Sequence, residues 1–346
     1  MLGGIPFEVL CSLLFLGFGR NAIAHSAGPG VADPGVTFLF YAIVACTTPA
    51  TRFTRECMMA EDFELLVHRQ ALCGKSPLWL SALNCLYWVD IMRRELHTYH
   101  RDSGIDEVRV LPGVVTALGA TRSGQLIAAA DRGFARVYPG RAALEQETGV
   151  HNGDRMNDGA CDPAGRFVAG TLDLARGAER NALFVLDGRR ARKLVDGLTV
   201  SDGVGWSPDG LVLYLVDSVE RTIWAYDYDA ERGCAGDGTR WVVCADAEGG
   251  PQGIAVDGSG RVWVAMQWSG RIHCYAPTGD LETVLWAPTR RITDLAFGGR
   301  RLDEMYVTSA CFGYDERELA DDSYAGALFR FRPGTVGLPA VPWNGL

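Results

Sequence analysis

The sequence predicts an all-β fold, a six-bladed β-propeller preceded by an N-terminal extension that lies outside the propeller. The first observation is a repeated phrase, in which a turn that ends in Gly precedes a short apolar strand. It occurs as Asp162-Pro163-Ala164-Gly165, Ser207-Pro208-Asp209-Gly210, Asp257-Gly258-Ser259-Gly260 and Thr121-Arg122-Ser123-Gly124, with weaker copies at Asn84 and Gly298-Gly299. The second observation is the spacing of these turns, roughly 40–50 residues, which is typical of one four-stranded sheet per blade. A blade cannot bury its faces alone, so the six units are expected to form one ring.

The first 57 residues do not carry the repeat. They hold two apolar runs, Val9–Phe18 and Val36–Cys46, and neither reaches the roughly 20 residues that a membrane-spanning helix needs. We expect residues 1–57 to be disordered, or to precede a true translation start at Met58 or Met59. A targeting or lipid-anchoring segment and genuine additional structure remain open alternatives. The propeller is expected to occupy residues 58–346.

The elements of the propeller follow in order. Phe63–His68 reads as a strand that would pair with Leu328–Arg332 and close the last blade, which removes two exposed edges. Further strands are expected at Leu86–Ile91, Glu95–Arg101, Val114–Ala120, Leu126–Ala130 and Ala135–Tyr138. Short helices are expected at Ala142–Glu147 and Asp315–Ala320. The tryptophans 79, 206, 263 and 268 are expected to pack in the propeller core.

Composition narrows the class of partner. The formal net charge is −9, which argues against a nucleic-acid partner because such partners select a basic surface. The ten cysteines form no CxxC pair, and several lie in apolar strands, where a free thiol behaves as a small hydrophobe. We therefore expect reduced thiols and a cytoplasmic protein; export or lipid anchoring through residues 1–57 is the alternative. The sequence gives no oligomeric state.

Four stretches resemble one family. They are GKSPLW (74–79) with LYWVDI, RMNDGACDPAGRFVAGT (155–171), SDGVGWSPDGLVLYLVDS (201–218) and PQGIAVDGSGRVWVA (251–265). They are similar to the regucalcin/gluconolactonase family, which also includes luciferin-regenerating enzyme, and the resemblance extends over roughly residues 62–345. It implies a six-bladed propeller with one divalent cation, calcium or zinc, at the channel mouth. It also implies hydrolysis of sugar lactones.

The resemblance assigns site residues, with changes at each metal position. The family takes a Glu, an Asn and an Asp as ligands, and the matching residues here are Lys75, Asp202 and Gln252. The substrate-binding Arg and Asn of the family are kept as Arg155 and Asn157. A downstream acidic substrate contact of some members falls near Ala175 and is absent.

The altered residues suggest what replaces the cation. Calcium prefers several oxygen ligands with negative charge among them, and a protonated Lys75 would repel it. We therefore expect the Lys75 ammonium to occupy the place of the cation and to pair with Asp202, since +1 and −1 sum to zero. The alternative is that Lys75 turns to solvent and that Asp202 and Gln252 hold a weakly bound ion.

The predicted function is lactonase-like hydrolysis of a small, sugar-type lactone at the propeller mouth. Asp202 would act as general base, while Lys75 and Arg155 would donate hydrogen bonds to the developing oxyanion. A Schiff base on Lys75 is disfavoured, because a neighbouring Asp202 raises the pKa of the amine. Two alternatives remain: a catalytically inactive propeller that binds a small molecule, and a metal-independent enzyme derived from the lactonase scaffold.

Overall fold

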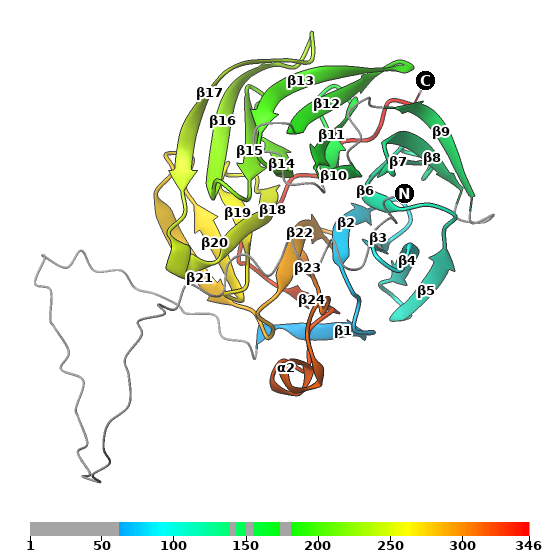
Figure 1. Cartoon of the computed structure of the whole chain (residues 1–346), viewed down its shortest axis with the longest axis vertical. Coiled ribbons are helices and arrows are strands. Elements are labelled where there is room, and N and C mark those ends of the chain that lie inside the picture. The colour runs from blue at the N-terminus through cyan, green and yellow to red at the C-terminus, as the bar shows by residue number, and fades with distance from the viewer. Residues whose placement is uncertain (1–61, 139–142, 150–154, 174–180, 346) are drawn as a thin grey trace, which may run out of the picture. The chain divides into compact units, whose positions relative to one another are not determined.

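Six four-stranded antiparallel sheets stand around a central channel (Figure 1). The computed structural model describes residues 62–138, 143–149, 155–173 and 181–345. The predicted propeller with six blades is confirmed. The predicted extension 1–57 and Ala175 lie outside the described residues.

Each blade contributes its strands in chain order from the channel outwards, except for the last. Blade 1 holds β2 (Gly74–Leu80), β3 (Cys85–Asp90), β4 (Glu95–His100) and β5 (Ile105–Val110). Blade 2 holds β6 (Val115–Ala120), β7 (Leu126–Ala130), β8 (Gly133–Tyr138) and β9 (Ala143–Gly149). Blade 3 holds β10 (Arg155–Cys161), β11 (Phe167–Leu172), β12 (Asn181–Asp187) and β13 (Arg190–Leu198).

The other three blades repeat this arrangement. Blade 4 holds β14 (Ser201–Trp206), β15 (Val212–Asp217), β16 (Thr222–Asp229) and β17 (Cys234–Val243). Blade 5 holds β18 (Gly250–Val256), β19 (Val262–Gln267), β20 (Arg271–Tyr275) and β21 (Leu281–Trp286), and a 3₁₀ turn (Asp246–Glu248) precedes it. Blade 6 holds β22 (Ile292–Gly298), β23 (Glu304–Ser309), β24 (Ala327–Phe331) and, outermost, β1 (Glu64–His68). The short helix α2 (Glu316–Asp321) lies between β23 and β24.

The first and last strands close the ring. β1 pairs antiparallel with β24, with Glu64 opposite Arg330 and His68 opposite Ala327, so the predicted closure is confirmed. The pairing is reinforced by an ion pair of 2.6 Å between Arg330 and Glu64. Arg330 also contacts Glu304, which in turn pairs with Arg101 of blade 1 at 2.5 Å.

The repeated turns have a local cause. In blade 3, Oδ1 of Asp162 accepts hydrogen bonds from the backbone N–H groups of Ala164 and Arg166, which folds the chain back on itself. Gly165 takes a φ of 84°, a left-handed conformation that favours glycine. The Asp-x-x-Gly spacing in the sequence therefore encodes the hairpin between the two innermost strands of the blade.

Of the two expected helices one is confirmed and one is wrong, and the expected burial of the tryptophans holds for three of the four. The helix expected at Asp315–Ala320 is confirmed as α2, which Asp315 caps by accepting from Glu318 N. The helix expected at Ala142–Glu147 is wrong, because Ala143–Gly149 is the outer strand β9. Trp79, Trp206 and Trp263 are buried as expected, but Trp268 is 41% exposed.

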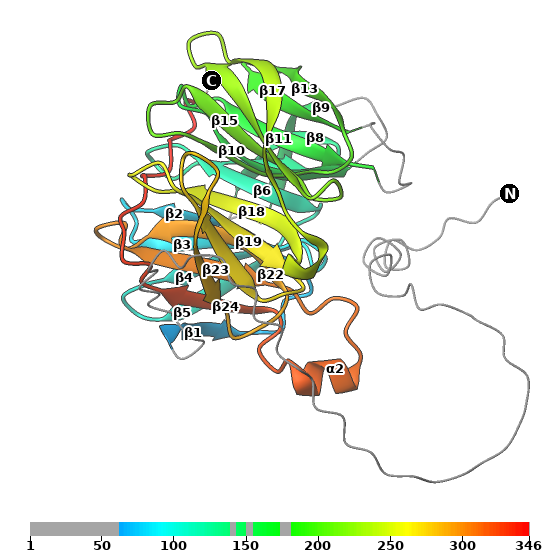
Figure 2. The ribbon, with the colours of Figure 1, turned by 90° about the vertical axis from the view of Figure 1, so that its left-hand side faces the viewer.

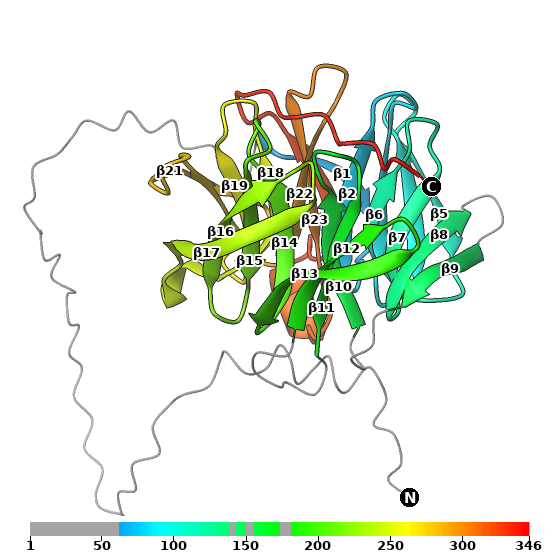
Figure 3. The same ribbon diagram turned by 90° about the horizontal axis from the view of Figure 1, so that it is seen from above.

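The ring has two distinct faces. The innermost strands begin at one face, which we call the mouth, and end at the other, which we call the far face. Figures 2 and 3 show the C-terminal segment running across one face, and Figure 2 shows α2 on the opposite side of the ring. The C-terminal segment lies on the far face, where Trp343 N donates to Ala120 O at the end of β6.

Two further features concern the described residues only. None of the seven cysteines among them takes part in a disulfide. In the same part of the chain, the helices lack the length and apolar character that crossing a bilayer requires.

Candidate functional site

The innermost strand of every blade breaks its pairing register close to the mouth. The irregularities fall between Lys75 and Leu78, Val115 and Ala117, Met156 and Gly159, Ser201 and Val204, Pro251 and Ile254, and Ile292 and Asp294. Such a bulge re-aims side chains that would otherwise alternate between the two faces of a sheet. Six of them at one level bring polar residues from different blades together at the start of the channel.

Buried carboxylates fix the segments that lead into two of these strands. Asp90, at the end of β3, accepts from the N–H groups of Leu72 and Cys73. Asp217, at the end of β15, accepts in the same way from Thr199 and Val200. The two anchors hold the backbone just before Lys75 and Asp202.

Lys75 lies at the centre of a buried charged cluster that consists of Lys75, Asp158, Asp202 and Asp294. Its Nζ is 2.8 Å from Oδ1 of Asp202 and 2.8 Å from Oδ2 of Asp158. Nζ also donates to the backbone carbonyl of Thr293 at 3.1 Å. The side chains of Lys75, Asp158 and Asp202 are only 4%, 7% and 5% exposed. The predicted pairing of Lys75 with Asp202 is therefore present.

The Lys75 ammonium is engaged within the protein. An ammonium has three donors and no acceptor; this one donates to Asp202 and to the Thr293 carbonyl, and Asp158 lies at ion-pair distance. A direct hydrogen bond from Lys75 to a substrate would compete with these contacts.

Asp158 and Asp294 are functional candidates that the sequence reasoning missed. Asp158 follows Asn157 directly, and Asp294 is the third residue of β22, as Asn157 is of β10 and Gln252 of β18. The position of Asp294 in its strand, and the position of Asp158 next to Asn157, are the sequence signals that could have identified them. The charge count from Lys75 and Asp202 alone was incomplete, because Asp158 and Asp294 also belong to the cluster.

The charged groups shift each other's pKa values. Burial alone would lower the pKa of Lys75, but Asp158, Asp202 and Asp294 raise it well above its ordinary value. Burial raises the pKa of Asp202, and the nearby Lys75 ammonium opposes this rise. Burial, together with the charge of Asp158, raises the pKa of Asp294 to about 8. Lys75 is therefore charged at neutral pH, and Asp294 holds a proton there for much of the time.

The two predicted substrate-binding residues lie beside the cluster. Asn157 is buried, and its Nδ2 donates to the carbonyl of Ser201 at 2.8 Å. Its own carbonyl accepts from Oγ1 of Thr116, so Asn157 connects blades 2, 3 and 4. Arg155 is half-buried and close enough to Asp202 to lower the pKa of that carboxyl.

Gln252 completes the set of predicted metal positions. It is half-buried on β18, and its backbone carbonyl packs against Gly203, the residue after Asp202. The structure thus brings the start of β18 next to the start of β14, as the resemblance implied.

The residues at this position do not fit a divalent cation. A buried ammonium, bonded to two carboxylates, takes the centre of the cluster, and a positive charge there would repel a second one. Among the described residues, no group of three or more His, Cys, Asp or Glu side chains has the arrangement of a metal site. The contacts around Nζ of Lys75 are those of an ion-paired lysine.

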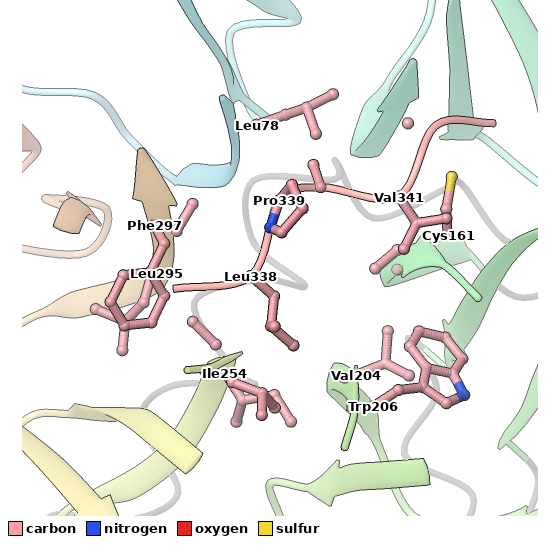
Figure 4. Close-up of a pocket in the computed structure, with 18 of the residues that line it drawn as sticks. Leu78, Cys161, Val204, Trp206, Ile254, Leu295, Phe297, Leu338, Pro339 and Val341 are labelled. Atoms are coloured by element: carbon pink, nitrogen blue, oxygen red, sulfur yellow. The ribbon is translucent and has the colours of Figure 1, made fainter. Parts of the chain in front are cut away.

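The described pocket of the channel lies on the other side of this cluster. It has a volume of about 490 Å³ and is lined by all six innermost strands and by residues 338–341. Figure 4 shows its apolar wall, with Leu78, Val204, Ile254 and Phe297 around the C-terminal segment. Asp158 and Asp294 line its inner end, whereas Lys75 and Asp202 do not line it.

The chain is similar in sequence to several known proteins. The sequence profile of the SMP-30/Gluconolactonase/LRE-like region matches residues 73–311. Pentonolactonase XacC of Haloferax volcanii is 34% identical over 77% of this chain and 92% of its own length. The 6-deoxy-6-sulfogluconolactonase of Pseudomonas putida is 31% identical over 81% of this chain and 97% of its own.

A solved structure shares the fold. The calcium-binding protein regucalcin from Agrobacterium tumefaciens superposes with a TM-score of 0.77 at 24% identity, over 81% of this chain and 96% of that protein. At this identity the likeness concerns the architecture alone.

Proposed function

Because the chain belongs to the SMP-30/gluconolactonase/LRE-like family, we propose that it hydrolyses a small, sugar-type lactone at the mouth, with the Lys75 ammonium in the place of a divalent cation. The observation that carries the proposal is the contact of Lys75 with both Asp158 and Asp202 at 2.8 Å. An internal cation of this kind supplies fixed positive charge at the position where the family resemblance implies a metal ion.

Asp202 serves as the general base. Its pKa is raised by burial, which moves the carboxyl towards the range in which a base is effective at neutral pH. The adjacent Lys75 keeps it ionised. Asp202 removes a proton from water, and the water oxygen forms a bond to the lactone carbonyl carbon. The ring C–O bond then breaks, the proton passes to the leaving ring oxygen, and the product is a hydroxy acid.

Arg155 stabilises the developing oxyanion. Its guanidinium is always charged and carries five donors, and it acts on Asp202 without occupying the centre of the cluster. The Lys75 ammonium already donates to Asp202 and Thr293 and forms an ion pair with Asp158, so we assign the direct contact with the carbonyl oxygen to Arg155. Lys75 acts through its charge on Asp202.

A second candidate function is plain ligand binding without catalysis. The observation in its favour is that groups expected to touch substrate are engaged within the protein: the Lys75 donors, and the Asn157 amide that donates to Ser201. In that case the charged cluster stabilises the fold, and the mouth binds a polyhydroxylated small molecule without converting it.

Hydrolysis of D-glucono-1,5-lactone and of a pentono-1,4-lactone, followed by acid release above the spontaneous rate, separates the two. We expect turnover that survives treatment with EDTA and falls about 100-fold or more in Asp202→Asn, the range for loss of a general base. Asp209→Asn, in an exposed turn of the same blade, is the matched control and should keep the wild-type rate. Turnover that EDTA abolishes and calcium restores would contradict the internal-cation proposal. No turnover of either lactone would favour the binding function.

A further inference from the structure

The channel pocket has the size and wall of a small-molecule site. Its volume of about 490 Å³ falls within the range of roughly 300–1,000 Å³ that ligand pockets occupy. Apolar side chains from five blades line it, among them Leu78, Leu118, Val204, Ile254, Leu295 and Phe297. Two tryptophans, Trp79 and Trp206, also face it. A wall of this composition favours a ligand with an apolar body.

The inner end of the same pocket is acidic. Asp158 and Asp294 line it, and each residue is only 5% exposed. Oδ1 of Asp294 accepts from Leu295 N and Oδ2 from Ser76 N, so both carboxylate oxygens are held by backbone donors. The Asp294 carboxyl is therefore fixed at the boundary between the cluster and the pocket.

When Asp294 is ionised, above its pKa of about 8, the cluster carries more negative than positive charge. Three carboxylates, Asp158, Asp202 and Asp294, are buried around the single ammonium of Lys75, whose contacts go to Asp158 and Asp202. Arg155 acts on Asp202 and does not line the pocket. Among the described residues, no ion pair within 4 Å includes Asp294, and the ammonium of Lys75 contacts the other two carboxylates. Burial and the charge of Asp158 raise the pKa of Asp294.

The outer end of the pocket is crossed by the C-terminal segment. On one side of the channel, Gly337 N donates to Leu302 O, and Gly258 N donates to Val336 O. On the other side, Trp343 N donates to Ala120 O, and Asn344 N donates to Gly165 O. Between these anchors, Leu338, Pro339 and Val341 border the pocket (Figure 4). We call residues 338–342 the strap.

We propose that this pocket is a second ligand site, distinct from the mouth, which binds a small amphipathic amine. The apolar body of the amine packs between the inner strands and the strap. Its ammonium pairs with Asp294 and Asp158 and supplies the positive charge that the cluster lacks on this side. Access is from the far face, past the strap, so the amine and a lactone at the mouth reach the cluster from opposite ends.

The charge of the head group decides between related ligands. A carboxylate of the same shape would face Asp158 and Asp294 and be repelled. An alcohol of the same shape would gain the apolar contact without the ion pair. Burying an ammonium beside a carboxylate is favourable only when the two groups meet directly, and this makes the amine the selective ligand.

The test uses the full chain and three compounds with one common body: 4-phenylbutylamine, 4-phenyl-1-butanol and 4-phenylbutyrate. Calorimetric titration at pH 9, above the pKa of about 8 of Asp294, measures the affinity. We expect saturable binding of the amine, at least tenfold tighter than that of the alcohol, and no binding of the carboxylate. Ala296→Phe, which fills the pocket from β22, should weaken amine binding at least tenfold and leave lactone turnover unchanged.

Matched variants keep the result interpretable. Leu281→Phe introduces the same phenyl side chain at an exposed position of β21 and should bind the amine as wild type does. If Ala296→Phe does not fold, Ala255→Phe fills the pocket from β18 instead. Equal affinity for the amine and the carboxylate, no saturable binding of the amine, or wild-type binding by a folded pocket-filling variant would overturn the proposal. None of these results depends on lactone turnover.

Discussion

At the residue scale, Lys75 joins four blades through one side chain. It belongs to blade 1, and its ammonium contacts Asp158 of blade 3, Asp202 of blade 4 and the Thr293 carbonyl of blade 6. A metal ion can join blades in the same way, through ligands from each. The ammonium differs because it is covalently attached to one blade, so chelators cannot remove it.

Substitution of Lys75 by Met should destabilise the protein strongly. The change keeps the aliphatic length but leaves Asp158 and Asp202 buried without their counter-charge, which costs about 3–5 kcal/mol for a broken buried pair. Urea unfolding at pH 7 measures the loss. Lys193→Met removes a half-exposed ion pair with Asp196 and should cost less than about 1 kcal/mol. Similar losses for the two variants would show that the Lys75 cluster contributes no more than a surface pair.

Asp294 should make stability fall as the pH rises. Its pKa is about 8 in the folded protein and 3.8 as the ordinary value, so between these values the folded state holds a proton that the unfolded state has lost. Stability then decreases with rising pH, by up to about 1.4 kcal/mol per unit from this group. Unfolding free energies at pH 5 and pH 7.5 should differ less in Asp294→Asn than in wild type. If the unfolding free energies of wild type and Asp294→Asn changed equally with pH, the raised pKa would not belong to Asp294.

At the element scale, the bulge near the start of each inner strand builds the site. The bulges allow the strands to approach closely, and one close approach between backbones is at Gly203 of β14. A Cβ on Gly203 would lie 2.4 Å from the carbonyl oxygen of Gln252 and 2.8 Å from Ile254 N. Both contacts are with backbone, which cannot move aside as a flexible side chain can.

Gly203→Ala should therefore displace β18 from β14 and weaken both stability and turnover. We expect a loss of at least 2 kcal/mol, the magnitude of overpacking, and at least a tenfold lower kcat/KM for lactone. Gly205→Ala, two residues along the same strand, meets only Val256 and Ile254 side chains at 3.3 Å or more and is the matched control. The melting temperature and kcat/KM of both variants provide the check. Equal effects of the two substitutions would mean that the close approach at Gly203 is not what limits stability and turnover.

The elements also show what the sequence could predict. The turn chemistry of Asp162 and Gly165 is local, so the blades and their order were predictable. The segment containing Ala143–Gly149 was predicted as helix because Ala, Leu, Glu and Gln have high helix propensity, but pairing with β8 determines its structure. Asp158 and Asp294 were missed because their meeting with Lys75 depends on bulges in three separate blades, which no local pattern encodes.

At the scale of the whole molecule, β1 holds the ring closed from the outside. Val67 of β1 and Phe63, which precedes the strand, are both buried. Glu304 of blade 6 is buried against Arg101 of blade 1. Without β1, the edge of β24 would be unpaired.

We expect a chain of residues 62–346 to unfold cooperatively with the same melting temperature as the full chain. A chain of residues 69–346, which lacks β1, should melt at least 10 °C lower or aggregate, since the sixth blade loses its outer strand and its buried side chains. Calorimetry on the two truncated chains provides the comparison. An unchanged melting temperature for the shorter chain would mean that closure does not depend on β1.

The closure by β1 also has a consequence in time. During synthesis, Glu64 can pair only after Arg330 has been made, and Arg330 lies 266 residues further along the chain. At synthesis rates of about 5–20 residues per second, the first strand of the propeller leaves the ribosome on the order of 10–60 s before its partner exists. Throughout that interval β1 is an open edge with Phe63 and Val67 uncovered. The nascent chain therefore has to keep this edge protected until β24 has been synthesised.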